Sequence, residues 1–121
     1  MNIQEYSHKA LRTLNCLGTY EANLAHMAMG ISGEAGEILD AVKKTFAYNK
    51  ALDKNHVIEE IGDVLFYING LLDVMEVSWD EALTTNIKKL EARYPAGHFD
   101  AQQAINRDVA AEKAAMGHHA V

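Results

Sequence analysis

The sequence predicts an all-α fold, and three observations favour it. Hydrophobic residues make up 49% of the 121 residues, which is enough to form a core. A single proline, Pro95, leaves long stretches of the chain uninterrupted. Apolar side chains recur in these stretches at helical spacing, as Val57, Ile61 and Val64 do.

Two helices are predicted in the first half of the chain. Residues 3–14 form the first, and Gly18 breaks its pattern. The side chain of Thr19 can cap a second helix that spans about 20–46. A turn then follows at residues 47–53.

The third helix is predicted at about 54–77, with Asp53 as its N-cap. It carries apolar residues on more than one side, which indicates burial in a bundle or at a subunit interface. Because only a short turn precedes it, we expect the second and third helices to be antiparallel neighbours.

The fourth helix opens with a capping box, in which Ser78 is followed three residues later by Glu81. It is expected to reach Tyr94, because Pro95 stops it there. Beyond it, the alanine-rich residues 100–116 predict a single weak helix.

We expect a single domain over residues 1–121, because this length fits one compact core. The core spans about 20–108, and 109–121 form a short helical tail that is expected to be mobile. His118 and His119 belong to this tail and are not expected to form a metal site.

Composition excludes several classes of function. The formal net charge of −6 argues against a nucleic-acid backbone as partner, since proteins that bind such backbones present basic faces. One cysteine, Cys16, cannot form an internal disulfide, which fits a reducing compartment. The N-terminal residues lack the pattern of a signal peptide, and the longest apolar run, residues 64–68, is too short to span a membrane. We therefore expect a cytoplasmic protein.

Two pairs of acidic residues stand out. Glu34 and Glu37 are three residues apart, and so are Glu60 and Asp63. Residues three apart on a helix are neighbours on one face. Each pair is therefore expected to present two carboxylates together.

The leading acid of each pair interrupts an apolar stripe. Glu34 lies between Ile31 and Ile38 at helical spacing, and Glu60 has similar surroundings in the third helix. Such a stripe faces the core, where an unpaired carboxylate is costly. Four acids that converge there would repel one another unless a cation lay among them. Mg²⁺ is the first candidate among the hard cations that prefer oxygen ligands.

A glycine precedes the second acid of each pair, at Gly36 and Gly62. Glycine inside a helix costs roughly 1 kcal/mol relative to alanine, so we expect another group to approach the backbone closely there. Asp40 extends the first acid row and can reach the metal or its water shell. Acid pairs also occur on solvated helix faces without any metal, and this structural interpretation stays open for either pair alone. Two pairs in apolar stripes favour a metal site.

A second group of polar residues lies on the fourth helix. Asn86, Lys89 and Arg93 follow an i, i+3, i+7 line, so they share one face. Lysine and arginine together suit a polyphosphate, as a point charge and a fork of N–H donors. A solvated charged face would produce the same pattern.

These motifs together resemble those of the MazG-like branch of the all-α nucleoside triphosphate pyrophosphohydrolases. The resemblance covers roughly residues 20–108. It rests on the acid pairs Glu34-x-x-Glu37 and Glu60-x-x-Asp63, on Asn86-Ile-Lys-Lys89-Leu-Glu-Ala-Arg93-Tyr94-Pro95, and on the closing Ala104-Ile-Asn106-Arg107-Asp108.

The resemblance implies hydrolysis of a (deoxy)nucleoside triphosphate between its α and β phosphates, by a homodimer or homotetramer built of four-helix bundles. It implies Mg²⁺, or Mn²⁺ in its place, as the cofactor. Glu34 or Glu37 would activate water, and Lys89 and Arg93 would stabilise the leaving group. The implied residues are the metal ligands Glu34, Glu37, Glu60 and Asp63, the phosphate contacts Asn86, Lys89, Arg93 and Tyr94, and a nucleobase pocket at Asn23, His26 and Met27.

Other functions fit parts of the same pattern. A narrow-substrate relative, such as a dUTP or dCTP pyrophosphatase, fits all of the motifs, whereas a phosphoribosyl-ATP pyrophosphatase fits the segment Asn86–Pro95 less well. A helical module that binds metal or a partner without turnover is a different class, and it predicts that Mg²⁺ raises thermal stability while no triphosphate is consumed. A ferritin-like redox protein would need paired Glu-x-x-His motifs, which this sequence lacks.

Overall fold

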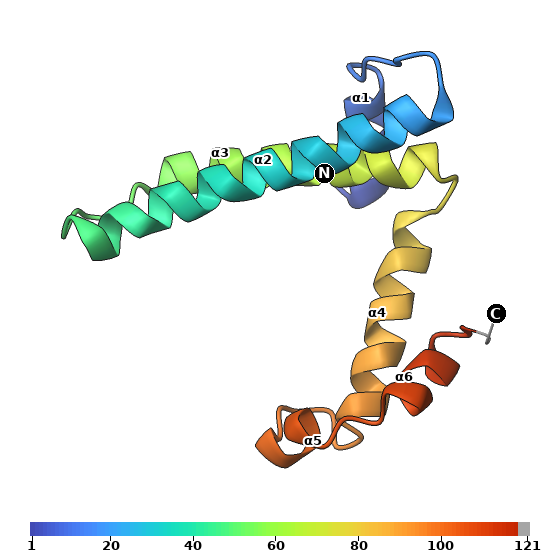
Figure 1. Ribbon diagram of the computed structural model, residues 1–121. Coiled ribbons are helices and arrows are strands. Elements are labelled where there is room, and N and C mark those ends of the chain that lie inside the picture. Colours follow the sequence, from blue (N-terminus) through green and yellow to red (C-terminus); the bar gives the residue numbers. More distant parts are fainter. Residues whose placement is uncertain (119–121) are drawn as a thin grey trace. The chain divides into compact units, whose positions relative to one another are not determined.

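The computed structural model describes residues 1–118, which contain six helices and no strand (Figure 1). The all-α prediction is therefore confirmed for this part of the chain. The described chain forms two compact units, one from Met1 to Val77 and a second that begins at Ser78. This division does not test the prediction of a single domain. It says only that contacts are denser within each unit.

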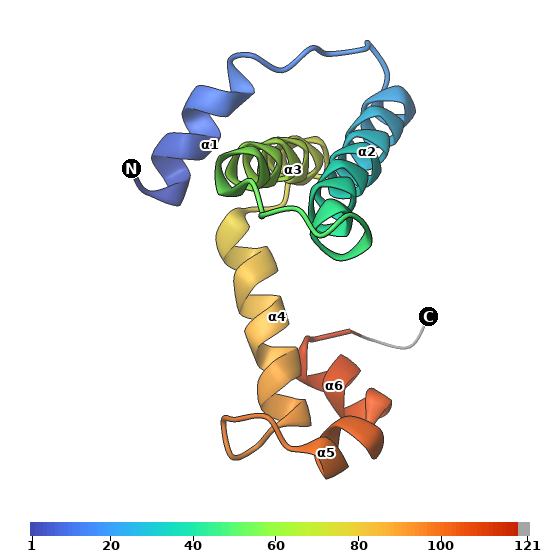
Figure 2. The same ribbon diagram turned by 90° about the vertical axis from the view of Figure 1, so that its left-hand side faces the viewer.

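The first unit contains α1 (Ile3–Leu11), α2 (Tyr20–Ala47) and α3 (Lys54–Val74). The helix α3 lies between the other two and packs against both (Figure 2). The expected pairing of the second and third helices is confirmed, because α2 and α3 make the most extensive contact between elements.

Short side chains set the starts of these helices. The side chain of Thr19 accepts a hydrogen bond from the backbone N–H of Ala22 at 3.1 Å, and that of Asp53 accepts one from His56 at 3.1 Å. Both caps match the sequence prediction because a cap needs only local residues.

The ends of α1 and α3 come three residues earlier than predicted. At the end of α1, the side chain of Thr13 donates to the carbonyl of Ala10 at 2.9 Å and closes the last turn. At the end of α3, Glu76 has a φ of 58°, a left-handed conformation that cannot continue a helix.

Close packing of α2 on α3 depends on two glycines. A Cβ atom added at Gly30 would lie 2.2 Å from the ring of Tyr67, and one at Gly70 would lie 2.3 Å from the sulfur of Met27. Met27 is itself only 1% exposed. The two helices can therefore approach closely at these positions only because no side chain intervenes.

The second unit contains α4 (Trp79–Arg93), α5 (Ala101–Ile105) and α6 (Val109–Ala115). Its first helix begins at the predicted capping box, where Ser78 accepts from the N–H of Glu81 at 3.0 Å. The helix α6 packs against α4.

The prediction of a single weak helix at residues 100–116 is wrong, because two short helices occupy this stretch. Asn106 leaves the helical conformation, with φ of −97° and ψ of 40°. The side chain of Asp108 then accepts from the N–H of Ala111 at 3.0 Å and starts α6. A competing cap inside the segment therefore divides it.

The expected tail at 109–121 begins with α6, and His118 after it is exposed. His119, the other histidine expected there, lies outside the described residues. Among the helices of residues 1–118, none is both long and apolar enough to cross a membrane.

Candidate active site

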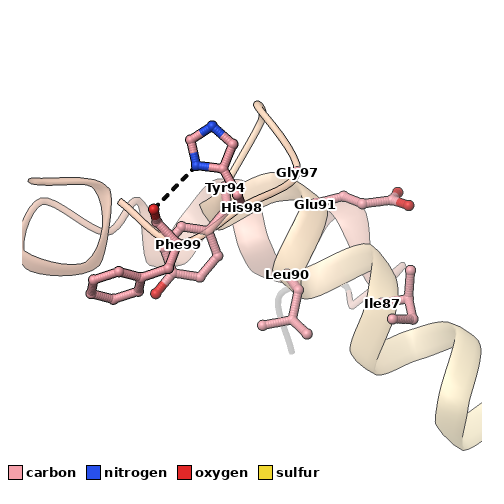
Figure 3. Close-up of a pocket in the computed structure, with 7 residues that line it drawn as sticks. All are labelled: Ile87, Leu90, Glu91, Tyr94, Gly97, His98 and Phe99. Carbon is pink, nitrogen blue, oxygen red and sulfur yellow. Dashed lines mark hydrogen bonds between the residues drawn. The ribbon is translucent and has the colours of Figure 1, made fainter. Parts of the chain in front are cut away.

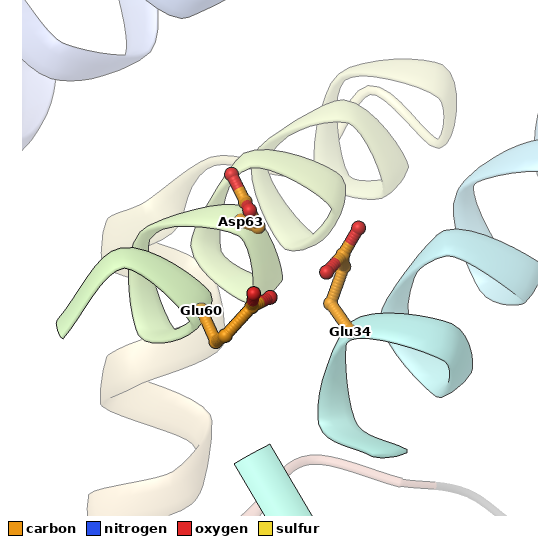
Figure 4. A group of neighbouring side chains, drawn as sticks. All are labelled: Glu34, Glu60 and Asp63. Carbon is orange, nitrogen blue, oxygen red and sulfur yellow. The ribbon is translucent and has the colours of Figure 1, made fainter. Parts of the chain in front are cut away.

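Three carboxylates converge between α2 and α3. Glu34 points from α2 towards α3, while Glu60 and Asp63 lie one turn apart on α3 (Figure 4). One oxygen from each of the three lies within 4.8 Å of those of the other two. This cluster, the three-acid group, consists of Glu34, Glu60 and Asp63.

Glu60 is the buried member of the three-acid group, and its carboxyl faces two other acids. Glu60 is 7% exposed, and its Oε2 atom is buried without a hydrogen-bond donor in the described part of the chain. The facing Glu34 carboxyl raises the pKa of Glu60 above its ordinary value, because a hydrogen bond between two carboxyls requires that one of them keep its proton. Burial and the charges of Glu34 and Asp63 raise this pKa further.

Two residues near the group were not among the predicted site residues. His56 lies one turn before Glu60, its Nδ1 atom is 3.8 Å from Oε1 of Glu60, and its charge lowers the pKa of that glutamate. Burial, followed by the charge of Asp63, raises the pKa of Tyr6 on α1. The i, i+4 spacing of His56 and Glu60 could have indicated the first contact, whereas Tyr6 is too distant in sequence to be found this way.

Glu37, the fourth predicted ligand, lies outside the three-acid group and is exposed. Glu37 has the same three-residue spacing from Glu34 that Asp63 has from Glu60, so helical spacing alone does not bring a carboxylate into the group. Asp40 is also exposed and forms an ion pair with Lys44 at 3.2 Å.

The two glycines beside the acid pairs do not mark a close contact within the described chain. No atom would lie within 4 Å of a Cβ added at Gly36 or Gly62. The predicted close approach occurs elsewhere, at Gly30 and Gly70.

The predicted phosphate contacts belong to the second unit. Asn86, Lys89 and Arg93 lie on α4 at the expected helical spacing, and Tyr94 is the residue that caps its end. Asn86 is exposed and Lys89 is half-buried. The guanidinium of Arg93 lies 5.9 Å from the centre of the Tyr94 ring.

Arg93 has a partner that the sequence did not reveal. Its Nε atom donates to Oε1 of Glu112 on α6 at 2.7 Å. Arg107 donates to the same carboxylate through Nε at 3.2 Å and through Nη2 at 2.6 Å. These three residues form the arginine cluster of the second unit. Hydrogen bonds from Arg107 and then Arg93 lower the pKa of Glu112 to about 2.

Comparison with known proteins identifies the family. The model of the MazG nucleotide pyrophosphohydrolase domain matches residues 22–98, which is more than half of the chain. The chain belongs to the MazG nucleotide pyrophosphohydrolase family. It is also similar to the Gene 37 protein of Mycobacterium phage L5, with 31% identity over 78 residues, which cover 61% of this chain and 68% of the relative. No solved structure matches the chain significantly.

The residues expected to form the base pocket of this MazG domain take part in local packing. Asn23 accepts from the N–H of Leu17 at 2.8 Å, and Met27 is buried against Gly70. The ring of His26 meets that of Tyr67 edge-on, with 6.0 Å between centres. The Nδ1 atom of His26 is buried without a hydrogen-bond partner among the described residues.

A pocket of about 440 Å³ lies in the second unit of the MazG chain (Figure 3). Its walls are mostly apolar and aromatic, and the residues that line it are Ile87, Leu90, Glu91, Tyr94, Gly97, His98 and Phe99. The rings of Tyr94 and Phe99 lie 5.9 Å apart and are tilted by 49°. The Nδ1 atom of His98 lies 3.2 Å from the carbonyl oxygen of Phe99, within hydrogen-bond distance (Figure 3).

Proposed function

We propose that this protein hydrolyses (deoxy)nucleoside triphosphates to nucleoside monophosphates and pyrophosphate, with Mg²⁺ at the three-acid group. Membership of the MazG family supports the reaction class. The single observation that carries the proposal is the buried Oε2 atom of Glu60, which has no hydrogen-bond partner among the described residues although the Glu60 carboxyl lies beside those of Glu34 and Asp63.

The donor set of the three-acid group fits a hard divalent cation. Carboxylate oxygens are the ligands that Mg²⁺ prefers, and Glu34, Glu60 and Asp63 each offer one. A bound cation would remove the need for Glu60 to keep its proton, because it neutralises the charges that raise its pKa. When bound, Mg²⁺ supplies charge neutralisation for the phosphates and a water of lowered pKa.

Several residues of the chain have roles in this proposal. A triphosphate carries several negative charges, so Lys89 and Arg93 would offset them and stabilise the leaving pyrophosphate. Asn86 and Tyr94 would add polar contacts to the phosphates. Glu37 is exposed, so its carboxylate is open to solvent and can accept a proton from the attacking water; Glu34 is the alternative base.

An oligomer with four-helix bundles is part of the same proposal. Ile58, Ile61 and Leu65 on α3 are 66%, 45% and 36% exposed, and their i, i+3, i+7 spacing places them on one face. On α2, Phe46 is 84% exposed. A second copy could cover these side chains, and two α2–α3 pairs would supply the four helices of a bundle. A homodimer or homotetramer is the expected assembly.

The reaction is tested by incubating the protein with each common ribo- and deoxyribonucleoside triphosphate and Mg²⁺, and by identifying the products. Glu34→Gln is the test variant, because glutamine keeps the shape and removes the charge. Glu59→Gln is the matched control, since Glu59 is exposed next to the site and lies outside the three-acid group.

We expect pyrophosphate from the parent and the Glu59 variant, and almost none from the Glu34 variant. Strong preference for dUTP or dCTP would define a narrow-substrate enzyme. Release of orthophosphate, or equal turnover by all three proteins, would contradict the proposal. Mg²⁺-dependent thermal stabilisation with no turnover of any triphosphate would instead favour the non-catalytic metal-binding module.

A further inference from the structure

The arginine cluster combines one buried carboxylate with two arginines that reach the surface. Glu112 has a side chain that is 2% exposed, whereas those of Arg93 and Arg107 are 17% and 39% exposed. The solvent-accessible side chains of the cluster are therefore its arginines, whereas the carboxylate is buried beside them. An anion approaching this surface would meet positive charge first.

The charges of the cluster do not cancel. Glu112 is ionised at neutral pH, because its pKa is about 2, and each arginine carries one positive charge. If Arg107 is counted against Glu112, Arg93 keeps a full positive charge. A simple pair of Arg93 and Glu112 would also fasten α6 to α4, but it would be neutral. Because Arg107 adds a second positive charge, the cluster can link α6 to α4 and still carry a net positive charge that attracts an anion.

Hydrogen-bond donors also remain after the internal contacts are made. A guanidinium has five N–H donors, and Glu112 receives one from Arg93 and two from Arg107. Arg93 donates to Glu112 through Nε and also hydrogen-bonds the side chain of Tyr94, so part of its five donors stays free for an anion. The fork of a guanidinium matches two phosphate oxygens.

We propose that Arg93 and Arg107, held side by side by Glu112, form a binding site for the pyrophosphate moiety of a nucleoside triphosphate. The identity of this anion rests on the proposed function, whereas the anion site itself rests on the cluster. Arg107 has two roles: it offers donors to the phosphate and cancels the charge of Glu112. Glu112 is a positioning residue that fixes the orientation of Arg93.

The test is a calorimetric titration of inorganic pyrophosphate into the full-length protein. In Arg107→Ala, Glu112 would neutralise Arg93, so we expect pyrophosphate affinity to fall by about tenfold or more. In the double variant Arg107→Ala/Glu112→Gln, Arg93 regains its net charge while glutamine can still accept from Nε. Affinity should then recover to several times that of Arg107→Ala. Lys113→Ala, which removes one exposed positive charge from α6, is the matched control and should bind nearly as the parent does.

A purely structural cluster gives a different pattern. If the cluster only fastens α6, the double variant will bind no better than Arg107→Ala, because it has lost more of the fastening. Arg107→Lys adds a second check, since it keeps the charge and loses the fork. We expect it to bind pyrophosphate more tightly than Arg107→Ala; equal loss in both would overturn the proposal, as would unchanged affinity in Arg107→Ala.

Pyrophosphate binding needs no turnover, so the two proposals can fail separately. A protein that hydrolyses triphosphates but binds pyrophosphate equally well with and without Arg107 would overturn the inference alone. A protein that hydrolyses none of them, yet loses pyrophosphate binding in Arg107→Ala and regains it in the double variant, would overturn the proposed function alone.

Discussion

Two buried glutamates of this protein face opposite electrostatic surroundings. Glu112 in the second unit is 2% exposed and receives three hydrogen bonds from two arginines, which lower its pKa to about 2. Glu60 in the first unit is 7% exposed and faces the Glu34 carboxyl, which raises its pKa. His56, at 3.8 Å, offsets this only in part.

The two units differ in the positive charge that surrounds the buried glutamate. The second unit supplies cations from its own chain and can bury Glu112 in ionised form. The first unit buries Glu60 among acids, an arrangement that favours protonation unless a cation comes from solution. An ionised Glu60 destabilises the metal-free protein, and a bound metal ion would offset this destabilisation.

The largest effect is expected from Glu60→Gln. Loss of a metal ligand should lower kcat/KM for triphosphate hydrolysis by about 100-fold or more, since even supporting residues of metal sites cost about 10–100-fold. The same variant should make the metal-free protein more stable, because one of three repelling acids becomes neutral. Activity assays and urea unfolding in EDTA would measure the two changes. A less stable variant would show that the acids do not repel one another.

A second prediction concerns the spacing of α2 and α3, which brings Glu34 to Glu60. Gly30→Ala would force a methyl group into the Tyr67 ring and should destabilise the protein by about 1–3 kcal/mol. Gly36→Ala meets nothing within 4 Å and should stabilise it by about 0.5–1 kcal/mol through helix propensity. Urea unfolding compares them. If Gly36→Ala also destabilises the protein, a group outside the described contacts, such as a second copy, approaches that backbone.

The smallest effect is a pair of opposite pH responses in the metal-free protein. The lowered pKa of Glu112 contributes stability above the ordinary value of 4.5, and this contribution disappears as the pH falls towards about 2. The raised pKa of Glu60 contributes stability that is complete below 4.5 and disappears as the pH rises through the raised value. Protection of α6 should therefore decrease in acid, while that of α3 should increase.

Hydrogen exchange, corrected for the intrinsic pH dependence, can follow both helices in one experiment with EDTA present. Glu112→Gln should flatten the response of α6, and Glu60→Gln that of α3. Parallel responses of the two helices in the parent protein would contradict the electrostatic contrast.

The sequence predicts those features of the structure that depend on residues close together in the chain. Thr19, Asp53 and Ser78 were recognised as helix starts because a cap acts on the next turn of the chain. The approach of Glu34 to Glu60 and Asp63 followed from helix periodicity and a short turn.

Long-range contacts were missed for a physical reason. Nothing in the alanine-rich stretch around Glu112 indicates that this residue meets Arg93, nineteen positions earlier. Helix ends were also less predictable, as Glu76 shows, because its left-handed conformation is not a preference of glutamate. The proximity of Tyr6 to Asp63, which raises the pKa of Tyr6, likewise depends on how α1 packs on α3.

Calorimetric titration of Mg²⁺ into the metal-free protein would show whether the three-acid group takes a cation from solution. The parent and Glu59→Gln should bind Mg²⁺ with similar affinity, and this affinity should fall as the pH is lowered, since a protonated Glu60 cannot serve as a ligand. Glu60→Gln should bind at least about tenfold more weakly. Equal binding by Glu60→Gln and the parent would contradict the account, as would a parent protein that binds no Mg²⁺ at all.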